Sequence, residues 1–110
     1  MLTPGRHYVD SPVRIAINFQ DEDRVDIDPD TVTFKAMAPG GSVTTYVYGT
    51  DAALAKVNTG DYYVDFTPDA SGLWHYRWVS TGTGETIVIE GKFRVQYSQF
   101  EEGTEAAYAL

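Results

Sequence analysis

The residues with the most chemical potential are six carboxylates that lie within ten positions of the chain. They are Asp21, Glu22, Asp23, Asp26, Asp28 and Asp30. Alternating aspartates in a loop supply the oxygen ligands that Ca²⁺ takes, but an EF-hand also needs a central Gly and a terminal Glu. That spacing is missing here, and Arg24 lies in the middle of the segment. Because Asp28-Pro29-Asp30 is typical of a turn, we interpret the segment as a solvated loop, with a calcium site as the alternative.

The sequence gives little support for nucleophilic or imidazole chemistry. The two histidines, His7 and His75, have no second histidine or carboxylate at a metal-ligand spacing. None of the five serines has the surroundings of a catalytic nucleophile. The chain has no cysteine, which excludes disulfides, thiolate metal sites and cysteine nucleophiles. We therefore predict a protein that is not an enzyme and that needs no cofactor and no metal.

Tyrosines are the third candidate for a functional site, since coplanar exposed rings bind sugars in carbohydrate-binding sandwiches. Tyr46 and Tyr48 lie on the same side of one predicted strand, and Tyr63 lies on the outer side of another. In the first strand the alternate set, Val43, Thr45 and Val47, competes with the tyrosines for the inward face. The sequence leaves this choice open, and an exposed aromatic patch would suit protein docking equally well.

Short strands must position all of these residues, and the clearest is Gly72–Trp78. Its alternate residues Trp74, Tyr76 and Trp78 point to one face, and each ring can bury roughly 150–250 Å². The opposite face carries His75 and Arg77. We expect the aromatic face of this strand to lie in the core.

The same two-residue alternation recurs along the chain, at 13–19, 31–38, 43–49, 61–67 and 85–95. Segment 51–57 is predicted to be a crossover that can end in a short strand. Gly91 interrupts the last strand, which predicts a bulge or a close approach of the backbone. The core predicted from the inward positions comprises Ile15, Ile17, Phe34, Val64, Trp74, Tyr76, Trp78 and Phe93.

Short strands at this spacing, with no helical period, predict an all-β fold. We expect an immunoglobulin-like β-sandwich of about seven antiparallel strands over residues 13–95. Residues 1–12 would be an N-terminal arm and 96–110 a C-terminal tail. At 110 residues the chain has the size of one domain.

The formal net charge of −8 makes binding to a phosphate backbone improbable, because such binding needs clustered Lys and Arg. The charge favours solubility or docking to a basic protein surface. No segment has the 18 apolar residues of a membrane span, and the first residues have no apolar signal-peptide core. We therefore expect synthesis and folding in the cytoplasm and no contact with membranes.

Four segments together resemble small Ig-like proteins of tailed bacteriophages and prophages. They are Val32–Lys35, Pro39–Asp51, Thr59–Asp65 and Gly72–Trp78, and the closing Glu90–Val95 with Ser98 and Phe100 fits the same group. The resemblance covers about residues 13–100. It implies a virion structural role, either in head decoration or at the head–tail junction.

From this resemblance we expect a structural protein of the virion, made in the host cytoplasm and present in multiple copies per particle. Its partners would be major capsid, portal or connector subunits, with contacts through sheet edges and the two termini. The predicted docking residues are Tyr8, Tyr97, Phe100, Tyr108 and Leu110. The alternative is a glycan-binding or adhesive module of a tail or fibre.

Overall fold

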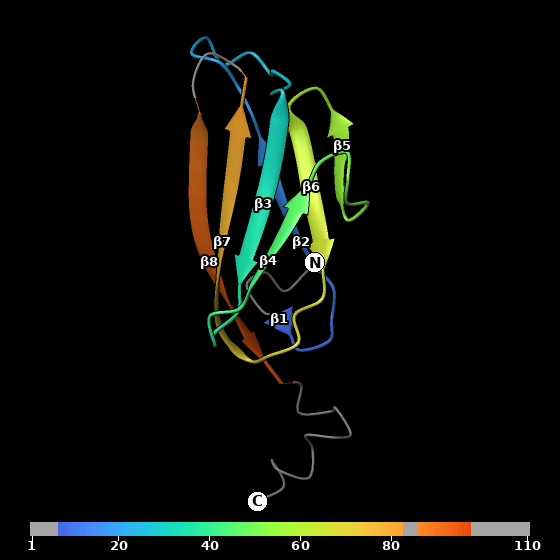
Figure 1. The fold of residues 1–110 in the computed structure, drawn as a ribbon, viewed down its shortest axis with the longest axis vertical. Helices are drawn as coiled ribbons and strands as arrows, with labels where there is room; N and C mark the ends of the chain where they lie inside the picture. Colours follow the sequence, from blue (N-terminus) through green and yellow to red (C-terminus); the bar gives the residue numbers. More distant parts are fainter. Residues whose placement is uncertain (1–6, 83–85, 98–110) are drawn as a thin grey trace, which may run out of the picture.

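The computed structural model describes residues 7–82 and 86–97, and every regular element in these ranges is a β-strand (Figure 1). The eight strands are β1 (His7–Tyr8), β2 (Val13–Asn18), β3 (Thr31–Met37), β4 (Val43–Val47), β5 (Leu54–Asn58), β6 (Asp61–Phe66), β7 (Gly72–Thr81) and β8 (Ile87–Gln96). Within those ranges there is accordingly no helix long and apolar enough to cross a membrane.

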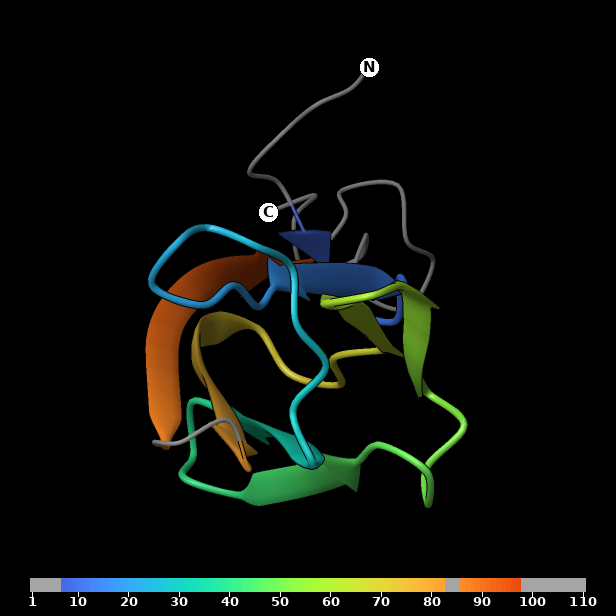
Figure 2. The same cartoon turned by 90° about the horizontal axis from the view of Figure 1, so that it is seen from above.

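The strands form two packed sheets, which Figure 2 shows along the long axis of the molecule. The larger sheet has the order β1-β8-β7-β3-β4 and curls around the core, and the smaller sheet has the order β2-β6-β5. All neighbouring strands are antiparallel except β1 and β8. The alternation in the sequence thus correctly predicted an all-β sandwich.

The sandwich begins earlier in the chain than the expected boundary at residue 13. In β1, His7 pairs with Val95 and Tyr8 with Gln96, in parallel register. The following residue, Val9, is only 6% exposed and belongs to the core. Two residues are too few to show alternation, so this strand gives no local signal. The segment before Pro12 is therefore partly a strand of the sandwich and not wholly an arm.

The segment expected to be a crossover, 51–57, does end in a short strand. β5 begins at Leu54, pairs with β6 and contains a register shift between Lys56 and Asn58. Leu54 is 2% exposed and pairs with Val64 on the neighbouring strand β6. Leu54 is therefore the residue through which this edge strand packs into the core.

The core is built around Phe34, which is fully buried. Its ring lies 4.8 Å from that of Trp78 and 5.8 Å from that of Tyr76, centroid to centroid, and it also contacts the rings of Tyr46 and Phe66. Val64, Trp74 and Trp78 are buried too, and the other four residues of the predicted core are half-buried and pack against this cluster. These four are Ile15, Ile17, Tyr76 and Phe93.

Gly91 causes a close approach rather than a bulge, because the β7–β8 register runs through it without a shift. The Tyr76 ring lies directly over Gly91, its cross-strand partner. A Cβ atom at position 91 would clash with the far end of that ring. Any larger residue at position 91 would therefore have to displace the Tyr76 ring.

Candidate docking site

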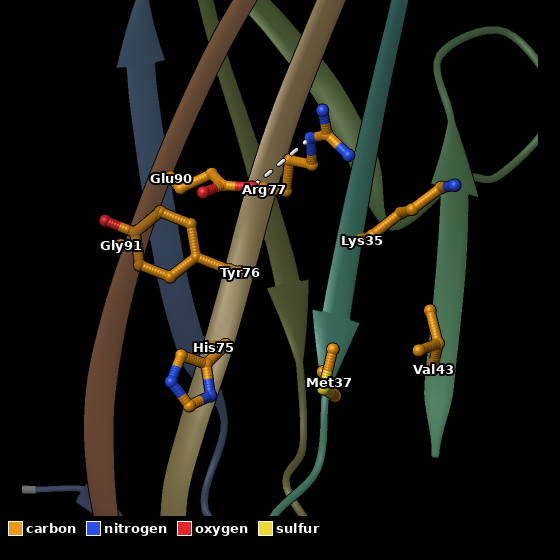
Figure 3. Close-up of a pocket in the computed structure, with 8 residues that line it drawn as sticks. All are labelled: Lys35, Met37, Val43, His75, Tyr76, Arg77, Glu90 and Gly91. Carbon is orange, nitrogen blue, oxygen red and sulfur yellow. Dashed lines mark ion pairs between the residues drawn. The ribbon is translucent and has the colours of Figure 1, made fainter. Parts of the chain in front are cut away.

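A groove of about 290 Å³ lies on the outer face of the larger sheet (Figure 3). Side chains from four neighbouring strands line it, with the Tyr76 ring and Gly91 on one side. The other lining residues are Lys35, Met37, Val43, His75, Arg77 and Glu90. They point outward because they alternate with inward residues such as Phe34 and Trp78.

The strand register sets these residues in two rows. In one row Lys35 pairs with Arg77, and Arg77 pairs with Glu90. In the other row Met37 lies between Val43 and His75, and His75 pairs with Lys92. Cross-strand partners have Cβ atoms about 4.5–5.5 Å apart. The groove therefore combines an apolar end with a charged row.

The charges on this face are mostly basic. The five strands of the larger sheet contain four basic residues, Lys35, Arg77, Lys92 and Arg94, all of them exposed, whereas Glu90 is the sole acidic residue in these strands. Arg77 Nε lies 3.5 Å from Glu90 Oε2. Within the described ranges the other three cations have no ion-pair partner. We call this set of five charged residues the basic face, and it lies on a chain whose formal charge is −8.

The carboxylates of the 21–30 loop accept hydrogen bonds from groups of the protein itself. Asp21 accepts from the backbone N–H of Asp23 and of Val25, which closes the turn. Asp26 accepts from the side-chain amides of Asn18 and Gln20. Within the described residues there is no group of three acidic, His or Cys side chains that could hold a metal ion. These two aspartates therefore serve the structure of the loop.

Asp28 fixes the same loop to the smaller sheet. One carboxylate oxygen accepts the N–H of Gly60 at 2.8 Å and the hydroxyl of Tyr62 at 3.2 Å, and the other accepts Lys56 Nζ at 2.6 Å. The bond from Lys56 and the bond from Gly60 hold the pKa of Asp28 below its usual value. Burial, together with the bond to Asp28, raises the pKa of Tyr62 to about 12.

The two histidines lie at different places on the larger sheet. His7 packs edge-on against Phe93, with ring centroids 5.3 Å apart. His75 is exposed and lines the groove. Of the described serines, Ser80 is buried, and its hydroxyl has no hydrogen-bond partner in the described part of the chain.

The structure decides which face of β4 is buried. Tyr46 points inward against Phe34 and Phe66, while Val43 is 53% exposed. Tyr48 lies after the strand, partly exposed, with its ring perpendicular to that of Tyr62. The Tyr63 ring is covered by the guanidinium of Arg14, 3.8 Å from the ring centroid. The three tyrosines therefore do not form a coplanar exposed row.

Two of the predicted docking residues fall within the described ranges. Tyr8 is half-buried in β1, and Tyr97 follows β8 with 40% of its surface exposed. Phe100, Tyr108 and Leu110 lie outside the described residues. Tyr8 and Tyr97 lie at the same end of the larger sheet, since β1 pairs with the end of β8.

Sequence reasoning missed the basic face as a unit. The predicted strand 72–78 puts Arg77 opposite the aromatic face, but no local pattern connects Lys35, Lys92 and Arg94 with Arg77. Each of these residues alternates with inward apolar residues, so the outward position of each could be derived from the sequence alone. Their proximity depends on the strand order β8-β7-β3, which local patterns do not contain.

No family model matches the sequence, and no curated protein matches it. A solved structure with a similar fold is chitinase ChiW from Paenibacillus sp. str. FPU-7, which is described as a cell-surface-expressed multi-modular enzyme machinery. The match has a TM-score of 0.59 and 22% sequence identity, and it covers 81% of this chain and 8% of the chitinase chain. At this level of identity the likeness concerns the fold, and this chain corresponds to a small part of that enzyme.

Proposed function

We propose that this protein is a non-enzymatic docking module of a tailed-phage particle. In this role it acts as a rigid block in head decoration or at the head–tail junction, and it binds an acidic surface of a neighbouring virion subunit. The observation that carries the docking role is the basic face. Three exposed cations have no ion-pair partner in the described ranges, on a chain that is otherwise strongly acidic.

Electrostatic complementarity supports this use of the face. A cluster of like charges on a rigid sheet steers an oppositely charged partner and suppresses wrong ones. The apolar side chains of Met37 and Val43, 42% and 53% exposed, lie beside the charges and supply contact area. An interface with an apolar centre and a charged rim is the usual composition of a protein contact.

The virion setting rests on the resemblance of the sequence to the phage Ig-like group. Under this proposal the chain is present in multiple copies per particle, and its neighbours are capsid, portal or connector subunits. The ends of the chain add contacts, with Tyr97 as the exposed anchor next to β8.

A glycan-binding module is the second candidate, and the similar fold within a chitinase favours it. A sugar platform needs exposed coplanar rings. Tyr46 faces inward and Tyr63 is covered by Arg14, so these two residues do not provide such a platform. We therefore rank protein docking first.

Add-back to particles tests the proposal directly. Particles made without this protein are mixed with the purified chain, and the bound fraction is measured by sedimentation at low salt and at about 0.5 M salt, where the screening length falls to a few ångströms. We expect binding that weakens with salt, and a loss of at least tenfold for the triple variant Lys35→Gln, Lys92→Gln, Arg94→Gln. Glycan-array binding by the same preparation measures the second candidate.

Arg24→Asn is the matched control, because it removes a cation from the acidic loop and leaves the basic face intact. Arg24 has φ of 64°, a conformation that Asn adopts readily. The control should bind like the parent chain. No binding of the parent chain to the particles, or equal binding of the triple variant, would refute the proposal.

A further inference from the structure

β4 forms one edge of the larger sheet. β4 is the last strand of that sheet, and no other strand pairs with its outer side in the described ranges. The hydrogen bonds from Ala38 N to Ser42 O and from Tyr48 N to Val32 O show which residues of β4 bond to β3 through their backbone groups. By antiparallel alternation, even-numbered residues of β4 bond to β3, and the backbone groups of Val43, Thr45 and Val47 point to the open side.

One end of this edge is already closed by the chain itself. The N–H of Val47 donates to Asp51 Oδ2 at 2.8 Å, and its carbonyl accepts the N–H of Thr50 and of Asp51. At the other end the chain turns away at Gly40 and Gly41. The open stretch is therefore only two hydrogen-bonding residues long, Val43 and Thr45.

We infer that this edge pairs with the same edge of a second copy of the chain, antiparallel about a two-fold axis at Thr44. In that register Val43 of each copy faces Thr45 of the other. The N–H and C=O groups of these residues then form four inter-chain hydrogen bonds and leave no open group on either strand. An isologous contact of this kind closes at two subunits.

The charges and side chains of the strand suit this occupant. β4 has the sequence Val-Thr-Thr-Tyr-Val, without a charge, Pro or bulge of the kind that blocks edge pairing. The nearest like charges would be Lys35 and its counterpart, which are three strand spacings and two residues along the strand from each other, or about 16 Å apart. That separation exceeds the screening length at physiological salt. Thr44 would face Thr44 of the other copy, and Thr pairs are favourable across strands.

The pairing is tested by sedimentation equilibrium of the purified chain at concentrations up to about 1 mM, where even a weak dimer is populated. We expect a concentration-dependent mass that approaches twice the monomer. Thr44→Lys should weaken the dimer at least tenfold, because it places like charges directly opposite each other. A monomer throughout, or a dimer unaffected by Thr44→Lys, would overturn the inference.

Crosslinking gives a second readout that does not depend on affinity. The chain has no cysteine, so Thr44→Cys introduces its sole thiol. The two Thr44 residues would form a non-hydrogen-bonded pair, with Cα atoms about 4.5 Å apart, within the range for a disulfide. We expect rapid disulfide-linked dimers for Thr44→Cys and slow ones for Thr59→Cys, an exposed turn position; equal rates would contradict the proposed register. This inference is independent of the virion proposal, since a monomer could still bind particles through the basic face.

Discussion

The outer faces of the two sheets differ in whether their basic side chains are paired within the chain. On the smaller sheet, Arg14 binds Asp65 through two hydrogen bonds of 2.8 Å and covers the ring of Tyr63. On the larger sheet, Arg77 reaches Glu90 only at 3.5 Å, and the neighbouring cations are unpaired within the described ranges. Charges that are satisfied inside the chain stabilise the fold, whereas charges left open are available to a partner. This difference is the reason why we propose the outer face of the larger sheet as the docking surface.

Docking through the outer face of the larger sheet requires that this sheet keeps its shape. We expect a substitution at Gly91 to disturb the sheet most. Gly91→Ala places a Cβ atom against the Tyr76 ring, and a shift of this ring would disturb its packing on Phe34 and Phe93. We expect a loss of about 1–3 kcal/mol in the free energy of unfolding, measured by urea denaturation.

Gly40→Ala is the matched control for this change. A Cβ atom at position 40 meets no atom within 4 Å, so this variant should unfold like the parent chain. The double variant Tyr76→Ala, Gly91→Ala should lose less stability than the sum of its single changes, because the clash is then absent. Additive losses would contradict the role of the ring.

Burial and hydrogen bonding of Tyr62 in the smaller sheet should make the free energy of unfolding depend on pH at high pH. The pKa of Tyr62 is raised from 10.0 to about 12, so the folded state resists ionisation of this phenol. A group whose pKa is raised on folding gives stability below its unfolded pKa and loses it as the pH rises. We expect the stability that Tyr62 contributes to be lost progressively between pH 10 and about 12, as its phenol ionises. Urea denaturation of the parent chain and of Tyr62→Phe should show a steeper loss for the parent, and parallel curves would refute this.

The two arginines allow a direct but smaller test of the contrast between faces. We expect Arg14→Gln to lower the melting temperature more than Arg77→Gln, because only Arg14 has a bidentate carboxylate and an aromatic ring. Arg14 holds the pKa of Asp65 below its usual value. The stabilisation is therefore present above the ordinary carboxyl pKa and is lost as the pH falls through the lowered one. Calorimetry at pH 7 and at about pH 2 should show that the Arg14 effect largely disappears in acid, and equal effects of the two variants would remove the contrast.

Much of the sandwich was predictable because inward and outward residues alternate along most of its longer strands. The same rule that placed Trp74 and Trp78 in the core also places Lys92 on the outside. β1 and the buried Val9 were not predictable, because they depend on a parallel pairing with a strand almost 90 residues away. The basic face was missed for a related reason, since it arises only when β3, β7 and β8 become neighbours.

The calcium alternative depended on a spatial question that sequence cannot answer. Carboxylates at spacing suited to a cation look the same in the sequence whether they face an ion or the donors of the protein. Here Asp26 and Asp28 face amide, ammonium, hydroxyl and backbone N–H donors. Those donors come from β2 and the segment just after it, from β5 and β6, and from the turn between β5 and β6, so their position depends on the fold.

Electron cryo-microscopy of the phage particle in which we propose that this chain resides tests the central claim most directly. The account predicts density for the sandwich with its larger sheet against a neighbouring virion subunit, and with acidic side chains of that subunit within ion-pair distance of Lys35, Lys92 or Arg94. A particle without the chain, or a sandwich whose basic face is turned toward solvent while another surface makes the contact, would contradict it.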